Sequence, residues 1–187
     1  MYTPRSSTSL PRRRLLQGLI AAFCWGMAPW LQAKDQFPEI TWDELVPSDW
    51  DPMKSFQDLP ELATLPDSDP RVQALYDQLR KIWDEAPTIS SLEGRAVKIP
   101  GFIVPLEGGK EGLREFLLVP YFGACIHTPP PPANQIIHVK SNPPVQGFQS
   151  MSSVWISGTI SLVRANSELG VSGYSMQAEH VEEYYWE

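Results

Sequence analysis

The fold is decided by residues 95–106, which read RAVKIPGFIVPL. Hydrophobic and polar residues alternate at the start of this stretch, and β-branched residues are frequent in it, as in a β-strand. Pro100 and Gly101 interrupt the pattern, because proline cannot donate to a strand ladder and glycine has no side chain to pack. The stretch therefore predicts one long strand with a bulge or bend in its middle.

Four segments further along the chain show strand patterns separated by turn-rich loops. They cover residues 113–119, 135–140, 154–163 and 174–184. The sequence EGGKEG at residues 107–112 makes a polar turn before the first of them. Five short strands, some bent by glycine or proline, predict a mainly β fold, a small and partly open five-stranded barrel of the oligonucleotide/oligosaccharide-binding (OB) type. A small β-sandwich permits the same strand count and is the alternative.

Upstream of the predicted barrel, residues 67–85 show helical spacing. Ser68 or Asp69 stands at the N-cap position, Pro70 occupies the first helical position, and the helix is expected to end before Pro87. Hydrophobic side chains recur at intervals of three and four, which predicts one amphipathic helix. This stripe consists of Val72, Leu75, Tyr76, Leu79, Ile82 and Trp83. We expect it to pack on the following domain or to bind a partner.

The chain is thus predicted to have four parts. Residues 1–33 form a signal peptide, 34–66 an extended arm, 67–90 the helix and a linker, and 91–187 the β-barrel domain. The arm is rich in proline, aspartate and tryptophan and lacks the periodicity of a helix or a strand. We therefore expect it to pack its aromatic side chains onto another surface.

The first 33 residues have the layout of an export signal. They carry four arginines and no acidic residue, and then a hydrophobic run that Gly18, Gly26 and Pro29 interrupt. A membrane-spanning helix needs about 20 uninterrupted hydrophobic residues. The sequence RRRLLQ at residues 12–17 fits a twin-arginine signal, and an ordinary Sec signal is the alternative. Cleavage is expected after Ala33, which predicts a soluble, periplasmic product.

Removal of the signal would leave an acidic protein with a single thiol. The signal holds four of the 15 basic residues, so 11 remain against 22 acidic ones, a formal charge of −11. Such a charge repels nucleic acid and anionic lipid. Cys24 leaves with the signal, and Cys125 remains without an internal disulfide partner. A cysteine of this kind is reactive, bound to a metal, paired with another molecule, or buried and inert.

The most specific segment joins the second and third predicted strands. Residues 116–135 read FLLVPYFGACIHTPPPPANQ. In an extended chain Cys125 and His127 point to the same side with Cα atoms about 7 Å apart, close enough to reach one metal ion. A thiolate and an imidazole suit zinc or copper. The prolines at 129–132 fix φ and remove amide donors, which predicts a rigid polyproline-like loop.

Two ligands are too few for a stable metal site, which needs three or four. His138 in the third predicted strand is the candidate for a further ligand, and Glu179 and His180 in the fifth are others. A catalytic interpretation, with Cys125 as nucleophile and His127 as base, lacks a visible orienting residue or oxyanion feature. The sequence also has no P-loop, dinucleotide fingerprint, HExxH or CxxC motif. We therefore expect no enzyme and no catalytic residue.

The chain resembles a family of small exported bacterial proteins of unknown function. The resemblance rests on residues 42–45, 100–106, 116–127 and 129–135 and on Gly173-Tyr174. Genes of this family often lie beside genes for ABC-type transport systems, some of them linked to zinc supply. The resemblance therefore implies an accessory role in the periplasm.

Two functions follow as hypotheses. In the first, the protein supports a transport system by binding zinc or copper through Cys125 and His127, which the resemblance implies as shared positions, with His138 as a further ligand. In the second, it is a non-catalytic docking module for an ABC-type transporter component or another envelope protein, and Cys125 is structural. Residues 184–186 and the tryptophans of the arm are the candidate docking surface.

Overall fold

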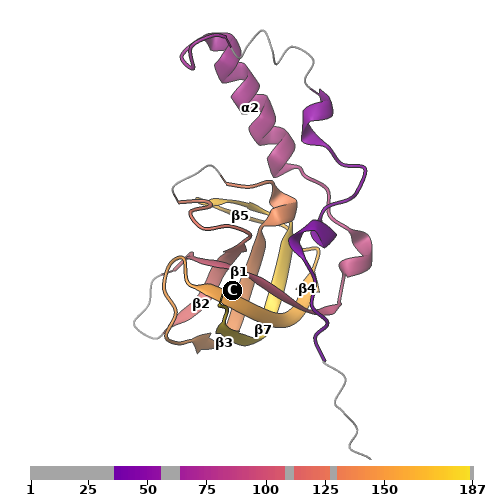
Figure 1. The fold of residues 1–187 in the computed structure, drawn as a ribbon, viewed down its shortest axis with the longest axis vertical. Coiled ribbons are helices and arrows are strands. Elements are labelled where there is room, and N and C mark those ends of the chain that lie inside the picture. Colours follow the sequence, from indigo (N-terminus) through magenta and orange to yellow (C-terminus); the bar gives the residue numbers. More distant parts are fainter. Residues whose placement is uncertain (1–35, 56–63, 108–111, 127–129, 186–187) are drawn as a thin grey trace, which may run out of the picture. The chain divides into compact units, whose positions relative to one another are not determined.

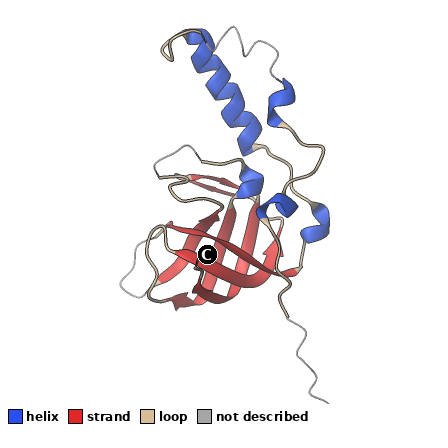
Figure 2. Cartoon of the chain, viewed as in Figure 1, coloured by secondary structure: helices blue, strands red, loops and turns tan. Residues whose placement is uncertain are grey.

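The structure is a computed structural model that describes residues 36–55, 64–107, 112–126 and 130–185. The predicted signal peptide lies outside the described residues. The described part is mainly β, with one α-helix and several short 3₁₀ helices (Figure 2).

Five strands form a closed barrel in the order β1-β2-β3-β7-β4 (Figure 1). Their bounds are Ala96–Pro105 for β1, Leu113–Val119 for β2, Ile137–Val145 for β3, Ser153–Ser161 for β4 and Tyr174–Glu183 for β7. Neighbouring strands are antiparallel except β3 and β7, which run parallel. The predicted five-stranded barrel is confirmed, and the sheet closes because β1 pairs with both β2 and β4.

The irregularity predicted at Pro100-Gly101 lies within a continuous strand. Strand β1 pairs with β4 up to Phe102 and with β2 from Phe102 onward, so the strand changes partner just after the Pro-Gly pair. A Cβ atom on Gly101 would lie 2.8 Å from Leu118 Cγ and from the Val119 carbonyl oxygen. Glycine at this position therefore allows β1 to approach β2 closely.

The barrel core consists of the side chains that alternate inward along the five strands. Val97 and Ile99 point inward from β1, and Lys98 between them points outward. The inward set, all completely or nearly completely buried, includes Val97, Ile99, Ile103, Phe116, Leu118, Ile137, Val139, Val154, Ile156, Ile160, Tyr174 and Met176.

The arm packs against β1 of the barrel. Ile40 N donates to Lys98 O and Lys98 N donates to Pro38 O, both at 2.9 Å. The Trp42 indole donates to the Pro100 carbonyl oxygen at 2.7 Å, so this arm aromatic packs on the barrel and does not form an external docking surface. Two 3₁₀ helices, Trp42–Leu45 and Pro52–Ser55, lie in the arm, where the sequence predicted no regular element.

Tyr174 joins the arm, the linker and the last strand. Its hydroxyl donates to the Leu45 carbonyl oxygen at 2.8 Å and accepts from the Ile89 amide at 2.8 Å. Leu45 and Tyr174 are completely buried. Ile89 stands just before the 3₁₀ helix Ser90–Leu92, which leads into β1. The N-terminal arm therefore supplies part of the barrel core.

The predicted helix is α2, Pro70–Asp84. Asp69 is its N-cap, since Asp69 Oδ1 accepts from Arg71 N at 2.9 Å. Hydrogen bonds from Arg71 lower the pKa of Asp69. At the other end, the Arg164 guanidinium donates to the carbonyl oxygens of Asp84 and Ala86. A cation at the C-terminal end of a helix satisfies carbonyl groups and complements the helix dipole.

Two parts of the fold differ from the predicted strands. Strand β3 begins after a 3₁₀ turn, Ala133–Gln135, and continues to Val145 through a register shift against β2. The extension includes Pro143 and Pro144, which a strand accepts at an irregularity. A small hairpin, β5 (Ala165–Ser167) and β6 (Gly170–Ser172), was not predicted, because three-residue strands have too short a pattern to recognise.

Candidate functional site

The loop that follows β2 carries the residues singled out in the sequence. Strand β2 ends at Val119, and Pro120 after it has no amide proton to continue the ladder. Two overlapping turns follow, with Ala124 N donating to Tyr121 O at 3.4 Å and Ile126 N donating to Gly123 O at 3.3 Å. The loop therefore folds back on the barrel, and the extended Cys-x-His geometry expected from the sequence does not begin at Cys125.

Cys125 has an uncommon backbone conformation. Its φ is +64°, in the left-handed region that few residues other than glycine adopt. This places its side chain in a second hydrophobic cluster, separate from the barrel core. The buried members of this outer cluster are Val104, Leu117, Val119, Ala124, Cys125 and Ile136. Only 9% of Cys125 is exposed, and burial raises the pKa of its thiol to about 11.

The thiol is therefore protonated at neutral pH. The pKa of an unperturbed cysteine is about 8.5, and the thiolate is the form that binds metals and attacks electrophiles. Within the described part of the chain, Cys125 is a free cysteine. While it is protonated and buried, the Cys125 thiol is inert toward metals and electrophiles.

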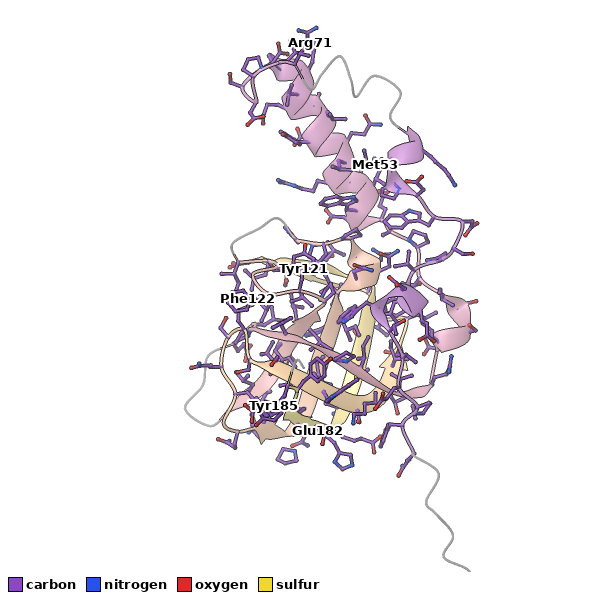
Figure 3. All side chains as sticks on the ribbon, viewed as in Figure 1. Met53, Arg71, Tyr121, Phe122, Glu182 and Tyr185 are labelled. Atoms are coloured by element: carbon purple, nitrogen blue, oxygen red, sulfur yellow. The ribbon has the colours of Figure 1, made fainter. Side chains whose placement is uncertain are left out.

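Three large hydrophobic side chains stand exposed around the buried Cys125. They are Tyr121, Phe122 and Ile126, which together we term the loop patch. Phe122 is 65% exposed, and Tyr121 and Ile126 are 43% exposed. Figure 3 shows Tyr121 and Phe122 as neighbours at the surface. The Phe122 ring meets the Phe102 ring edge-on, with centroids 5.9 Å apart.

The surroundings of the loop patch in the sequence are uncharged. No Asp, Glu, Lys or Arg occurs between Phe116 and Ile137. The sequence feature that could have indicated the loop patch is the pair of consecutive aromatic residues next to Gly123. The sequence could not show that they are exposed, because the same residue types usually complete a small core.

Met151 contacts the loop that follows β2, and nothing in the sequence predicted this contact. The Gly123 amide donates to the Met151 thioether sulfur at 3.2 Å, and Met151 packs against the outer cluster. Met151 also has a left-handed backbone, with φ of +63°. The β3–β4 connection thus braces the loop that holds Cys125. No pattern in the serine-rich sequence around Met151 pointed to this contact.

The predicted metal ligands are not brought together by what the structure describes. His127 lies outside the described residues. His138 points outward from β3, opposite Leu117 of β2. In residues 36–55, 64–107, 112–126 and 130–185, no group of three or more His, Cys, Asp or Glu side chains could hold a metal ion.

His138 belongs to a small charged group on the outer face of β2 and β3. Its Nε2 atom lies 3.3 Å from Glu115 Oε2, and Lys140 Nζ lies 3.3 Å from Glu115 Oε1. The imidazole and the carboxylate are not aligned for a hydrogen bond, and the buried His138 Nε2 atom has no hydrogen-bond partner in the described part of the chain.

The remaining candidates lie elsewhere on the barrel. His180 is on β7, opposite Ser157 of β4, and its ring meets the Phe37 ring edge-on at 5.9 Å. Of the predicted C-terminal docking surface, Tyr184 packs edge-on against Trp155, Tyr185 is exposed, and residue 186 is outside the described part.

Together, the fold and this loop define a class of small β-barrel proteins with an N-terminal arm in the core and an exposed hydrophobic loop. The chain belongs to the family described as protein of unknown function (DUF3299), whose model matches residues 42–183. It is similar to a crystal structure of a DUF3299 family protein from Pseudomonas aeruginosa PAO1, with 38% sequence identity and a TM-score of 0.62. That match covers 81% of this chain and 98% of the other.

A comparison with curated proteins finds no match. Among the residues that the structure describes, no helix is both long enough and hydrophobic enough to cross a bilayer.

Proposed function

We propose that the protein is a non-catalytic periplasmic accessory module that docks an envelope protein, such as a component of an ABC-type transporter, through its loop patch. The observation that carries the proposal is the exposure of Tyr121, Phe122 and Ile126 on one braced loop. Large hydrophobic side chains that remain exposed together on a small protein mark interaction surfaces.

The energetics of docking favour this loop. Full burial of one large hydrophobic side chain contributes about 1.5–3 kcal/mol, and aromatic residues are enriched among the few interface residues that dominate affinity. The turns after Pro120 and the contact from Gly123 to Met151 hold the loop in place before binding. A preorganised loop loses little entropy when a partner covers it. In this proposal Cys125 is structural, filling the outer cluster below the patch.

The export signal expected in residues 1–33 supports a periplasmic location for this function, and the acidic charge of the remaining chain favours a protein partner over nucleic acid or anionic lipid. The buried, protonated Cys125 offers no nucleophile at neutral pH. This agrees with a role without catalysis.

A second candidate is a zinc or copper site that uses Cys125 and His127. Its support is the left-handed backbone of Cys125, a strain that persists only where the surrounding structure enforces it and that is frequent at functional sites. A metal ion would have to displace the thiol proton, so its affinity would rise with pH. If the thioether of Met151 also took part, the two soft sulfur ligands would favour copper(I) over zinc.

The docking proposal is tested by photo-crosslinking in the cell. A photoreactive phenylalanine analogue replaces Phe122 in one strain and Tyr76 in another, since Tyr76 is a comparably exposed aromatic residue on α2. The proposal predicts a discrete crosslink to one envelope protein from position 122 and none from position 76. It also predicts that Tyr121→Ser with Phe122→Ser abolishes co-purification of that protein. Equal crosslinking from both positions would contradict docking through the loop patch.

The metal candidate is separated from docking by elemental mass spectrometry. The protein is purified from the periplasm without chelator or affinity tag, beside its Cys125→Ser variant. Near-stoichiometric zinc or copper that disappears in the variant supports the metal site. A protein that stays metal-free when zinc and copper are supplied excludes it and leaves docking as the function.

A further inference from the structure

The side chain of Met151 connects two loops on the outside of the barrel. Its thioether sulfur accepts a hydrogen bond from the Gly123 amide at 3.2 Å, and the side chain packs against the outer cluster. Gly123 lies between Phe122 and Ile126, so the contact is made in the middle of the loop patch segment. A thioether is a weak hydrogen-bond acceptor, and the contact therefore depends on the chemical state of the sulfur.

The backbone around Met151 is fixed on the barrel. The Met151 amide donates to the Ile103 carbonyl oxygen of β1 at 2.8 Å, and the Ile103 amide donates to the Ser152 carbonyl oxygen at 3.1 Å. The Ser152 amide donates to the Gln149 carbonyl oxygen, and the Ser152 hydroxyl accepts from the Gln149 amide, both at 3.0 Å. Because its backbone is held in place, a change in the Met151 side chain acts on the loop that contains Gly123.

Met151 differs from the other sulfur-containing residues that the structure describes. Met176 is 1% exposed and belongs to the barrel core, whereas Met53 is 44% exposed on the arm. Cys125 is buried, and its thiol is protonated at neutral pH, which protects it from oxidation. Met151 is partly exposed, and a thioether has no proton to lose before it reacts. Met151 thus combines access to an oxidant with a contact that holds a loop.

We propose that Met151 is a site of reversible oxidation to methionine sulfoxide, and that this modification releases the loop that carries the loop patch. The oxidant is a two-electron oxygen donor such as hypochlorous acid. The sulfur loses two electrons and gains an oxygen atom, and hypochlorous acid becomes chloride and a proton. A methionine sulfoxide reductase reverses the step with two thiols, which become a disulfide while the oxygen leaves as water.

Oxidation weakens the contact between the two loops. Electron density moves from the sulfur to the new oxygen atom, so the sulfur no longer accepts effectively from the Gly123 amide. The sulfoxide is also polar, whereas the outer cluster against which Met151 packs is hydrophobic. The loop is then less ordered before a partner covers it, and binding costs more entropy. This last consequence rests on the docking function proposed above.

Two variants of the exported protein separate Met151 from the exposed Met53. Met53→Leu keeps Met151, and Met151→Leu keeps Met53; leucine preserves the hydrophobic volume of methionine at either position. Each purified protein is treated with limiting hypochlorous acid, and peptide mass spectrometry locates the added oxygen. We expect sulfoxide at Met151 in the first variant and at Met53 in the second, with Met176 unmodified in both.

Hydrogen exchange of residues 121–126 then measures the state of the loop. In oxidised Met53→Leu these amides should exchange about 3- to 10-fold faster than before oxidation, because one net hydrogen bond is lost. A methionine sulfoxide reductase should restore the original rate. In Met151→Leu the oxidant should leave the rate unchanged. The proposal is overturned if Met151 is oxidised no faster than Met176, if sulfoxide at Met151 leaves the exchange unchanged, or if Met151→Leu shows the same increase.

Photo-crosslinking from position 122 tests the consequence for docking. In cells treated with the oxidant, the crosslink should decrease about 3- to 10-fold in Met53→Leu and persist in Met151→Leu. An undiminished crosslink from a protein that carries the Met151 sulfoxide overturns control of docking by oxidation. If the untreated protein gives no crosslink, the docking function fails, and the exchange rates alone decide whether oxidation of Met151 releases the loop.

Discussion

At the scale of single residues, the Tyr174 hydroxyl connects the last barrel strand to the arm and to the linker. It donates to Leu45 O and accepts from Ile89 N, and both Tyr174 and Leu45 are completely buried. Tyr174→Phe keeps the ring but leaves the buried Leu45 carbonyl and the half-buried Ile89 amide without this partner. Buried groups that lose their hydrogen bond cost about 1–3 kcal/mol. We expect the free energy of unfolding to fall by that amount in urea denaturation.

Tyr76→Phe is the control for this prediction. The Tyr76 hydroxyl is exposed and lies 3.4 Å from Asp67 Oδ1, so its removal should change the stability by less than about 0.5 kcal/mol. Equal effects of the two substitutions would show that Tyr174 does not join the arm to the barrel.

Cys125 should react slowly with alkylating reagents in the folded protein. With a pKa of about 11, the fraction of thiolate at pH 8 is smaller by about two orders of magnitude than for a thiol of pKa 8.5. The rate of iodoacetamide modification, followed by mass spectrometry, should therefore rise steeply up to pH 11. Rapid modification at pH 7.5 that requires no unfolding would contradict the burial of this thiol.

The same pKa difference predicts how stability depends on pH. Folding raises the pKa of Cys125, so the folded state retains the thiol proton at pH values where the unfolded chain has lost it. The resulting stabilisation is complete below about pH 8.5 and is lost as the pH rises through about 11. Urea denaturation of the protein and of Cys125→Ala should show a steeper decline above pH 9 in the unchanged protein. Parallel curves would contradict this linkage.

At the scale of elements, the sequence predicted what depends on local pattern. Strand β2 has the predicted bounds, and Asp69 caps α2 as one of the two residues expected there. The arm was not predicted to enter the core, because the burial of Leu45 and the hydrogen bond of Trp42 depend on β1 and β7, far away in the sequence. Contacts between segments that are distant in the sequence produce no local repeat of hydrophobic residues from which they could be predicted.

Arg164 is expected to hold the C-terminal end of α2. Its guanidinium donates to Asp84 O and Ala86 O across 80 and 78 residues of sequence. In Arg164→Ala the last turn of α2 loses these donors, and its amide hydrogens should exchange about 10-fold faster, because about 1.4 kcal/mol of local stability corresponds to that factor. Hydrogen exchange measured by mass spectrometry resolves α2 from the barrel strands. Arg80→Ala, an exposed position on the same helix, should leave exchange at the end of α2 unchanged.

At the scale of the whole molecule, closure of the barrel depends on a small residue where β4 meets β7. The register shifts between Ser157 and Gly158, and a Cβ atom on Gly158 would overlap the carbonyl oxygen of Gln177. We expect Gly158→Ala to lower the free energy of unfolding by about 3 kcal/mol or more, as for other steric overlaps in a packed interior. Thermal and urea denaturation of the two proteins would measure this loss.

Gly147→Ala separates steric overlap from backbone strain. Gly147 has φ of +82° and open space around its Cα, so alanine there meets only the left-handed conformational cost of about 1–2 kcal/mol. An equal or smaller effect at Gly158 would mean that β4 and β7 can separate without loss of the fold.

The candidate site could be predicted only in part. The sequence drew attention to Cys125 because a lone thiol in an uncharged, proline-bounded segment is conspicuous. It suggested either a metal ligand or a buried structural thiol, and the fold packs Cys125 in one cluster with Val104, Leu117 and Ile136. The exposure of Phe122 and the support from Met151 arise from how two loops meet on the barrel, and neither loop encodes this by its own pattern.

The hydrogen bond between Leu45 and Tyr174 joins residues 129 positions apart, and this has a consequence for the time order of synthesis. Leu45 is made early in translation, and it cannot form this bond until Tyr174 at the start of β7 has left the ribosome. The barrel therefore cannot close until the end of translation, because β7 lies between β3 and β4. An export system that translocates unfolded chains, such as Sec, can bind the protein during all of this time. The twin-arginine system translocates folded proteins, so it can act only after β7 is complete.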